Sequence, residues 1–284
     1  MHIAPHDNAN KPIIDVNHPK VPATFFNIVK LKAGETFESK IPGYETCIAP
    51  ATGTVDVFAG AERFENIGGR GVDVWDGEPE GVYVPTGMPA AITCKSPSAE
   101  IFIAGARFDE VLTPFAVRAD EIDHVQYGSD ETKTHRKIKH ILGQKQKDRV
   151  GRLLVSELFT VGAGGWSGFP PHKHDEDRLP TESKHDEVYN FRFRPNHGFG
   201  MQLLEPKHSD KQNHIGEAFH LVDGSTFAIE EGYHPCVAAP GYEMYYFTIL
   251  GGHSQRPLVQ FFHPVHEYQV HTIPGIADMV AKFK

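Results

Sequence analysis

Most of the chain consists of short runs of β-branched and aromatic residues, each bounded by glycine, proline or aspartate. Such runs are typical of β-strands, because branched and aromatic side chains pack well on a pleated surface while glycine and proline favour turns. Strands this short and this closely spaced favour an antiparallel barrel or sandwich over a loose mixture of helices and strands. In the N-terminal half the runs are residues 24–31, 54–58, 71–75, 81–84, 91–93 and 99–104.

A polar stretch separates these runs from a second series. Residues 116–150 are rich in lysine, aspartate and glutamine and have a weakly helical pattern, which predicts a connector. The strand pattern then returns in residues 153–161, 187–193, 200–204, 218–222, 225–229, 236–239 and 244–250. We therefore expect an all-β protein with an N-terminal unit (1–115), a connector (116–150) and a C-terminal unit (151–284). The pattern suggests two tandem barrels, although no exact sequence repeat relates them.

The composition argues against several classes of function. A formal net charge of −9 disfavours non-specific nucleic-acid binding, which depends on lysine and arginine to neutralise phosphates. No apolar run approaches the roughly 20 residues that cross a bilayer, and residues 1–7 do not read as a signal peptide. Cys47, Cys94 and Cys236 are too far apart to form a metal knuckle or a disulfide framework. We expect a cytoplasmic protein with a small-molecule partner, and exposed strand edges are compatible with a homo-oligomer.

Two histidines in the segment Pro170-Pro-His-Lys-His carry the first chemical signal. His172 and His174 stand two residues apart, and alternate residues of a strand point to the same face. Both imidazoles can therefore face the interior of a barrel. A single buried histidine is usually structural, whereas a His-x-His pair on a strand points more strongly to a metal site.

A carboxylate and a third histidine accompany later strands. Glu187 opens a strong strand, where a buried carboxylate is costly unless it is paired or binds a metal. His234 follows a Gly-Tyr turn and precedes Pro235. Three imidazoles and one carboxylate leave one or two positions open on Zn²⁺, Mn²⁺ or Fe²⁺, as a Lewis-acid catalyst requires. Alternation along the strand also places Tyr189, Phe191 and Phe193 on the face of Glu187, and Arg192 and Arg194 on the other.

These segments resemble the two motifs of the cupin family, a His-x-His…Glu set and a later Gly…Gly…His segment on adjacent strands. The resemblance departs from the usual pattern in three respects. Glu230 stands where a proline is common, and only Tyr233 lies between Gly232 and His234. Twelve residues (175–186) separate His174 from Glu187, where three or four are usual. An inserted loop explains this gap, and we expect it to be solvated, or to close over a substrate as a lid. It also leaves alternative ligands close to the site, namely Glu176, Glu182 and His185.

A narrower resemblance rests on longer segments. They are Gly165-Trp-Ser-Gly-Phe-Pro-Pro-His-Lys-His-Asp, Glu187-Val-Tyr, Gly198-Phe-Gly-Met-Gln, Glu231-Gly-Tyr-His-Pro, Ala239-Pro-Gly-Tyr-Glu-Met-Tyr-Tyr and Pro264-Val-His-Glu. Together they are similar to the 5-deoxy-glucuronate isomerases of myo-inositol catabolism, which belong with the 5-keto-4-deoxyuronate isomerases. The resemblance extends more weakly through the N-terminal half and so covers nearly the whole chain.

The resemblance implies one divalent metal ion per chain, with zinc favoured over manganese or iron. Val84-Pro-Thr-Gly-Met-Pro-Ala looks like a cupin motif in which Ala90 replaces the histidine ligand. The N-terminal barrel is therefore expected to lack a metal site. The metal of the C-terminal barrel would be held by the four residues His172, His174, Glu187 and His234.

The reaction that the resemblance implies is an aldose–ketose isomerisation of 5-deoxy-glucuronate to 5-dehydro-2-deoxy-gluconate through an enediolate. A metal would polarise the carbonyl, and either a base would move the proton or a hydride would shift directly. The candidate catalytic residues are Tyr189, Gln202 and Tyr245, each of which could equally fill the barrel. Arg256 and Lys173 are candidates to bind the substrate carboxylate, although strand alternation counts against Lys173 because it should face away from its histidine neighbours.

Two other functions are compatible with the same residues. A cupin dioxygenase would use iron held by similar ligands and would consume oxygen. A non-catalytic sugar-binding or storage cupin would bind a sugar acid without turnover. Metal content and an assay for ketose formation separate these alternatives from an isomerase.

Overall fold

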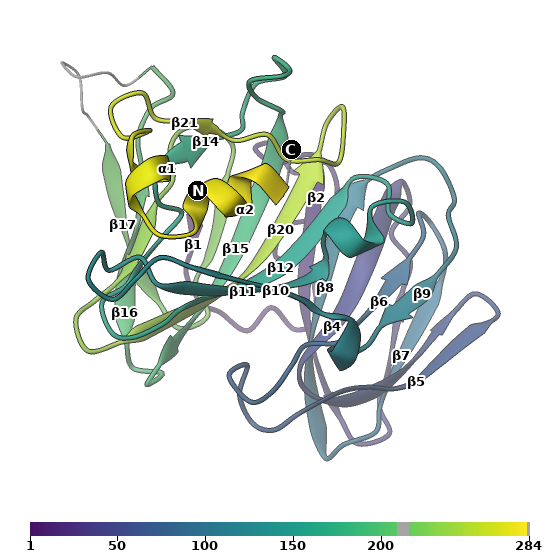
Figure 1. The fold of residues 1–284 in the computed structure, drawn as a ribbon. Helices are drawn as coiled ribbons and strands as arrows, with labels where there is room; N and C mark the ends of the chain where they lie inside the picture. The colour runs from purple at the N-terminus through teal and green to yellow at the C-terminus, as the bar shows by residue number, and fades with distance from the viewer. Residues whose placement is uncertain (209–215, 283–284) are drawn as a thin grey trace.

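The computed structural model describes residues 1–208 and 216–282, and it is nearly all-β, as predicted (Figure 1). A first group of strands lies on one side of the molecule. Its members are β2 (Thr24–Lys32), β3 (Thr36–Ser39), β4 (Tyr44–Ala59), β5 (Glu62–Arg70), β6 (Gly81–Val84), β7 (Ala90–Cys94), β8 (Ser98–Arg107) and β9 (Phe115–Val117). The order β2-β8-β4-β6-β9 forms one sheet, while β3, β5 and β7 pair beside the long strand β4.

A second group forms the other side. Its members are β10 (Asp123–Tyr127), β11 (Arg136–Leu142), β12 (Leu153–Thr160), β13 (Trp166–Ser167), β14 (His172–Lys173), β15 (His185–Arg194), β16 (Phe199–Leu204), β17 (Glu217–Val222), β18 (Thr226–Ile229), β19 (Cys236–Ala238), β20 (Glu243–Gly252) and β21 (Phe261–Phe262). The N-terminal strand β1 (His2–Ile3) joins this group by pairing with β18.

Two antiparallel sheets and one short pair make up the second group. The larger sheet has the order β1-β18-β15-β20-β12-β11-β10, and the smaller has the order β13-β19-β16-β17. The pair β14-β21 lies at the upper end in Figure 1, near the short helices α1 (Gln269–Thr272) and α2 (Ile276–Lys282). Two single-turn helices, η1 (Ala119–Glu121) and η2 (Gln144–Gln146), complete the described elements.

Two local predictions are wrong. The run 71–75 is not a strand, because Asp76 accepts hydrogen bonds from the backbone N–H groups of Val72 and Asp73 and the segment turns on itself. The weak helix expected within 116–150 is replaced largely by β10 and β11, which extend the larger C-terminal sheet. The sequence did not predict β11 as a strand because it contains the charged residues Arg136 and Lys139. Both side chains are buried, where each has a polar partner.

The two groups of strands share one apolar core. It includes Phe102 of β8 and Phe247 of β20, whose ring centroids lie 4.8 Å apart. Beside this core, the buried guanidinium of Arg70 donates to both carboxylate oxygens of Glu157, at 2.8 and 2.5 Å. Tyr245 also donates its hydroxyl to Glu157, at 2.9 Å. Because Arg70 and Glu157 come from different groups, this pair ties the two sides of the molecule together.

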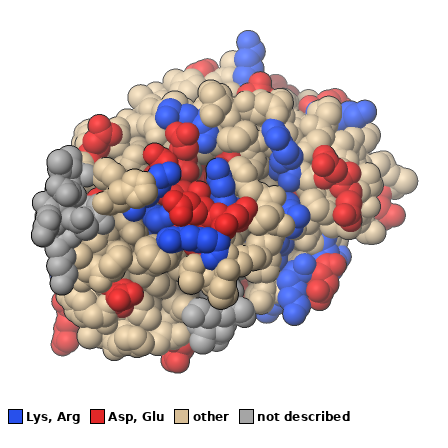
Figure 2. All heavy atoms as spheres, turned by 90° about the horizontal axis from the view of Figure 1, so that it is seen from above, with Lys and Arg blue, Asp and Glu red and all other residues tan. Residues whose placement is uncertain are grey.

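The surface seen from above carries acidic and basic side chains beside one another (Figure 2). Among the described residues, no helix is long and apolar enough to span a membrane.

The Arg70–Glu157 pair gives the first prediction. Glu157→Gln removes the counter-ion of a buried arginine and should lower the free energy of unfolding by about 3–5 kcal/mol, measured by urea denaturation. Tyr245→Phe serves as the control, because it removes one hydrogen bond to the same carboxylate and should cost about 1 kcal/mol. Equal stabilities of Glu157→Gln and the wild type would contradict this assignment.

Candidate metal centre

Three titratable side chains meet inside the C-terminal strands. Glu187 lies on β15, His174 directly follows β14, and His234 lies just before β19. One donor atom from each residue lies within 4.8 Å of the others, and all three residues are buried. Glu187 Oε2 is 3.1 Å from His174 Nε2 and 3.2 Å from His234 Nε2. Imidazole nitrogens and carboxylate oxygens are the donors that Zn²⁺ and related ions prefer, so this group could hold a metal ion.

Backbone carbonyls set the orientation of both rings. His174 Nδ1 lies 3.0 Å from the carbonyl oxygen of His185, and His234 Nδ1 lies 2.8 Å from that of Gly232. A carbonyl only accepts hydrogen bonds, so each ring carries a proton on Nδ1 and directs Nε2 at Glu187. Histidine ligands of metals are commonly held in this way.

The carboxylate is held from one side and open on the other. Thr248 donates its hydroxyl to Glu187 Oε1 at 2.9 Å, which leaves Oε2 facing the two rings. His234 Nε2 is buried and makes no hydrogen bond to a described residue. An orphaned ring nitrogen beside a carboxylate oxygen fits a bound cation, because buried polar atoms otherwise find a partner.

The charges of the group also suit a cation. Burial alone would raise the pKa of Glu187, but the hydrogen bond with His174 and the positive charge of the two histidine rings lower it below its usual range. Burial likewise opposes protonation of His174, yet the hydrogen bond and charge of Glu187 outweigh burial and raise its pKa. Glu187 is therefore anionic, and positive charge is favoured at the position where a metal ion would lie.

His172 lies beside this group but outside the three-residue cluster. Its ring centroid is 5.1 Å from that of His234 and 6.3 Å from that of His174. Its Nδ1 donates to the carbonyl of Pro170 at 3.0 Å, and its Nε2 accepts from the amide of Gln260 at 2.9 Å. Burial and the neighbouring histidines lower the pKa of His172 to about 3, so the ring is neutral.

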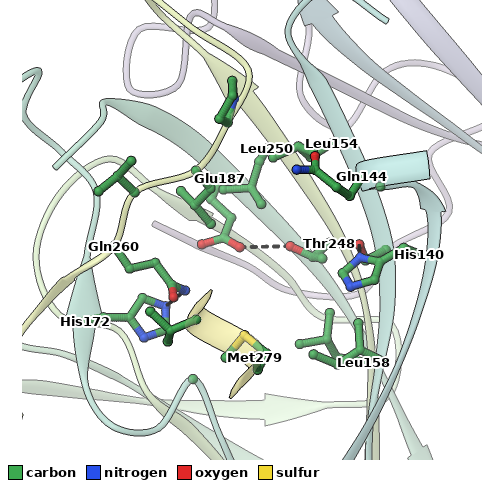
Figure 3. A pocket seen from close by; sticks show the side chains of 18 of the residues that line it. His140, Gln144, Leu154, Leu158, His172, Glu187, Thr248, Leu250, Gln260 and Met279 are labelled. Carbon is green, nitrogen blue, oxygen red and sulfur yellow. Dashed lines mark hydrogen bonds between the residues drawn. The ribbon is translucent and has the colours of Figure 1, made fainter. Parts of the chain in front are cut away.

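A cavity of about 420 Å³ opens beside Glu187 (Figure 3). This volume lies within the range of ~300–1,000 Å³ that is typical of small-molecule sites. One part of the wall is apolar, with Leu154, Leu158, Leu250 and Met279. The polar part of the wall includes His140, Gln144, Ser156, His172, Tyr189, Thr248, Arg256 and Gln260.

The alternative ligands of the inserted loop lie elsewhere. His185 is buried with Nε2 facing the carbonyl of Arg256 at 3.1 Å. Glu182 is fully buried in ion pairs with a lysine and an arginine, and Glu176 is partly exposed. Among the described residues, Glu187 is the carboxylate that joins the two histidines.

One candidate catalytic residue is on the wrong face. Tyr245 pairs with Arg192 in the register of β15 and β20 and points, as that arginine does, away from Glu187. Its hydroxyl is bound to Glu157 in the core between the two groups of strands. Its neighbour Tyr246 lines the cavity instead, together with Thr248. Either member of the Tyr-Tyr pair fitted the sequence, because only the register with β15 decides which one faces inward.

Two further candidates do not line the cavity. Lys173 is buried, with Nζ 2.5 Å from Asp175 Oδ1 and 2.8 Å from Glu182 Oε1, so its charge is already compensated. This location contradicts a role in binding substrate and agrees with the strand alternation. Gln202 donates from Nε2 to the backbone carbonyl of His234 at 2.7 Å, which makes it a support for that histidine.

Arg256 and Tyr189 both line the cavity. Arg256 donates from Nε to the carbonyl of Leu153 and from Nη2 to those of Leu142 and Gly143. Its Nη1 atom has no hydrogen-bond acceptor among the residues that the structure describes. Burial lowers its pKa to about 10, so the guanidinium remains charged at neutral pH. Burial and the charge of Glu187 raise the pKa of Tyr189, which is therefore a neutral phenol.

Several cavity residues were absent from the sequence prediction. Thr248 is two residues after Tyr246, so strand alternation along β20 would have predicted it once Tyr246 was known to face the cavity. Gln260 and Met279 come from the C-terminal segment, which carries no motif that links it to the histidines. Their positions follow from how the end of the chain folds over the sheet.

Comparison with known proteins identifies relatives over most of the chain. The sequence model of the KduI/IolB family matches residues 2–269. The 5-deoxy-glucuronate isomerase of Shouchella clausii is 33% identical over 241 residues, which cover 84% of this chain and 85% of that protein. The protein of the same name from Geobacillus kaustophilus is 30% identical over 250 residues, covering 88% and 83%.

Solved structures share the fold. An IolB-like protein from Salmonella typhimurium LT2 superposes with a TM-score of 0.77 at 23% identity and covers 94% of each chain. The oxalate decarboxylase of Lactobacillus farciminis, solved as a formate complex, superposes with a TM-score of 0.66 at 10% identity and covers 100% of this chain and 96% of that one. At these identities the likeness concerns the fold alone.

The three-residue group predicts where a metal would bind. His234→Ala removes one of the three donors that meet at this point, so the purified variant should retain less than about a tenth of the wild-type metal content. Elemental analysis measures this directly. His253→Ala is the control. His253 is partly exposed and is paired with Asp186 instead of Glu187, so this variant should retain the metal. Equal metal content in wild type and His234→Ala would contradict the assignment.

Proposed function

The chain belongs to the KduI/IolB family, and on this premise we propose that it is an aldose–ketose isomerase acting on 5-deoxy-glucuronate. The product would be 5-dehydro-2-deoxy-gluconate, the ketose formed when the aldehyde and its neighbouring hydroxyl carbon exchange oxidation states. The proposal is supported by the shared name of relatives that match more than four fifths of the chain. Inositol catabolism would be the pathway in which this reaction occurs.

One observation carries the chemistry. The buried group of His174, Glu187 and His234 lies beside a cavity whose wall includes Glu187 and Arg256. We propose that these three residues hold a divalent ion, zinc being favoured over manganese or iron. His172 would complete the set after its Nε2 exchanges the Gln260 amide for the ion. A bound ion would polarise the aldehyde oxygen and stabilise the negative charge that develops when the adjacent C–H bond breaks.

The surrounding side chains have separate tasks. Thr248 keeps Glu187 in one orientation through Oε1, so that Oε2 is directed at the ion-binding position. Tyr189 remains protonated because its pKa is raised, and its phenol is suited to donating a hydrogen bond to a substrate oxygen. The apolar wall formed by Leu154, Leu158, Leu250 and Met279 limits the entry of water and strengthens these electrostatic interactions.

Arg256 is proposed to bind the substrate carboxylate. Its charged side chain lies in the cavity wall, and hydrogen bonds from Nε and Nη2 to backbone carbonyls hold the guanidinium in place. Nη1 makes no hydrogen bond to a described residue and is available to the substrate. A rigid guanidinium recognises a carboxylate through directed hydrogen bonds. The aldehyde end of the substrate would then lie near Glu187 and the carboxylate end near Arg256.

We also propose that the two groups of strands are two cupin-type barrels, of which the first holds no metal. Its interior is filled by an apolar core that includes Ala90, Ile92, Val55 and Ile101, which leaves little room for a ligand set. One ion per chain follows. A cytoplasmic location is supported by three free, buried cysteines, and a homo-oligomer remains part of the same proposal.

Metal removal tests the activity. Chelation should abolish ketose formation from 5-deoxy-glucuronate, and adding back Zn²⁺, Mn²⁺ or Fe²⁺ should restore it, as followed by NMR of substrate and product. Undiminished turnover after complete metal removal would refute the metal-assisted mechanism. Oxygen consumption with cleavage of substrate carbon bonds would instead favour the dioxygenase alternative, and metal binding without turnover would favour a sugar-binding cupin.

The carboxylate contact gives a separate prediction. Arg256→Met should lower kcat/KM by about 10- to 100-fold, since hydrogen bonds to charged groups contribute about 1.5–3 kcal/mol. The effect should fall mainly on KM if the contact is equal in the ground state and the transition state. Thermal unfolding checks that the variant is folded, because Arg256 also binds three backbone carbonyls. An unchanged KM in a folded variant would exclude the contact.

A further inference from the structure

The twelve-residue insertion between His174 and Glu187 folds back onto the candidate metal centre. The backbone N–H of His185 donates to the carbonyl of His174 at 2.9 Å, and the His174 ring returns a hydrogen bond to the carbonyl of His185 at 3.0 Å. These two bonds close the loop at its base. Residues 177–181 of the insertion are exposed, as expected for a solvated loop, whereas Glu182 and His185 are buried.

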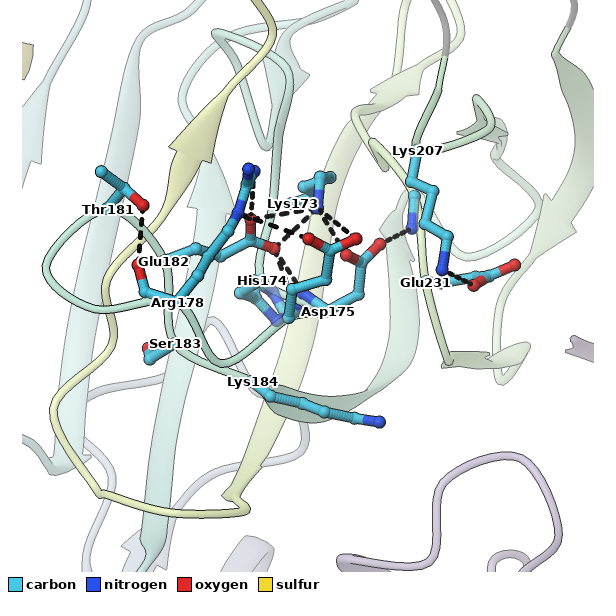
Figure 4. Close-up of polar contacts among 12 residues, drawn as sticks. Lys173, His174, Asp175, Arg178, Thr181, Glu182, Ser183, Lys184, Lys207 and Glu231 are labelled. Atoms are coloured by element: carbon cyan, nitrogen blue, oxygen red, sulfur yellow. Dashed lines mark hydrogen bonds and ion pairs between the residues drawn. The ribbon is translucent and has the colours of Figure 1, made fainter.

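Glu182 holds the loop together from its centre (Figure 4). Its side chain is fully buried and accepts hydrogen bonds from Lys173 Nζ at 2.8 and 3.0 Å. The guanidinium of Arg178 donates to it at 2.9 and 2.7 Å, and the backbone N–H groups of Asp175 and Glu176 donate at 2.8 and 3.1 Å. The Glu182 carboxylate therefore holds the start of the loop, at Asp175 and Glu176, close to Arg178 further along it.

Asp175 extends this network to the second histidine segment. Its Oδ1 accepts from Lys173 at 2.5 Å, while its Oδ2 accepts from the backbone N–H of Gly232 at 2.7 Å. The carbonyl of Gly232 in turn accepts the Nδ1 proton of His234 at 2.8 Å. Gly232 has a positive φ of 92°, and a Cβ there would lie 2.4 Å from the carbonyl oxygen of Glu205, so a residue with a side chain would not fit at this position.

The network is separate from the cavity. Lys173 and Arg178 are ion-paired with Asp175 and Glu182, and Arg178 also with the partly exposed Glu176. Lys173, Asp175, Arg178 and Glu182 are not among the residues that line the cavity beside Glu187. Contact with substrate therefore does not explain why four charged groups converge here. Their connections lead instead to the backbone on either side of His174 and to the carbonyl that orients His234.

We propose that Lys173, Asp175 and Glu182 are positioning residues that hold His174 and His234 in the geometry required for metal binding. The inference rests on the metal centre of the proposed function. It also gives Lys173 a role: the lysine joins Glu182 of the loop to Asp175, which in turn binds the Gly232 segment.

Asp175→Asn tests the proposal. An aspartate accepts at both oxygens, whereas an asparagine has one acceptor oxygen and must turn its NH₂ group toward either Lys173 or the Gly232 N–H. One of the two links is therefore lost without a change in side-chain size. Supporting partners of metal ligands contribute about 10- to 100-fold in affinity, so the Kd for Zn²⁺ should rise by about that factor. Competition with a chromophoric chelator on metal-free protein measures it.

Glu176→Gln is the matched control. It makes the same carboxylate-to-amide change on the same loop, but Glu176 is 40% exposed in its side chain and lies 4.0 Å from Lys173. Its Zn²⁺ affinity should stay within twofold of the wild type. Cobalt-loaded protein gives a second readout, because the absorption bands of Co²⁺ report ligand geometry and should change in Asp175→Asn and not in Glu176→Gln.

A double variant covers the case in which Asp175→Asn does not fold. Lys173→Met with Glu182→Gln removes one positive and one negative charge together, so the net charge of the network does not change, and Asp175 keeps its hydrogen bond from the Gly232 N–H. It should also weaken Zn²⁺ binding by at least tenfold. Unchanged affinity and an unchanged Co²⁺ spectrum in folded variants would overturn the positioning role, even if thermal stability fell.

The two proposals fail in different ways. Wild-type protein that binds no Zn²⁺, Mn²⁺ or Fe²⁺ would overturn the metal centre and the positioning role together. Wild-type protein that binds the ion tightly, with Asp175→Asn equal to it, would overturn the positioning role alone and leave the proposed function intact.

Discussion

The buried carboxylate of Glu187 is the constraint around which the C-terminal half is organised. A carboxylate in a protein interior costs several kcal/mol unless positive charge and hydrogen bonds compensate it. Here Thr248 binds one oxygen and the rings of His174 and His234 face the other. Each ring is in turn held by a backbone carbonyl. The arrangement leaves donor atoms directed at one point, which is the condition for binding a cation.

Two sets of contacts outside the cavity support this group. The inserted loop joins the histidine segments through ion pairs of Lys173 and Arg178 with Asp175 and Glu182. Glu45 accepts the backbone N–H groups of residues 151–153 and so fixes the start of β12. The carbonyl of Leu153 then binds Arg256 in the cavity wall. The N-terminal strands thereby influence the site without contributing a ligand to it.

Strand alternation explains why much of the site could be predicted. The face shared by Glu187, Tyr189 and Phe191 follows from the two-residue period of a single strand, and the structure places these residues as expected. The same rule argued against Lys173 as a cavity residue. It could not choose between Tyr245 and Tyr246, because the phase of β20 relative to β15 depends on pairing between residues more than 50 positions apart.

The sequence by itself determined the strand-rich fold, the residue types of the candidate metal centre and their alternation, since these depend on local spacing. Only the tertiary structure decided which neighbours each residue meets. It placed His172 against Gln260, buried Glu182 as an anchor, turned 123–127 and 136–142 into strands and brought the C-terminal segment over the cavity. These outcomes depend on contacts between segments that are far apart in the sequence. The spacing of residues within one segment does not reveal the free energies of such contacts.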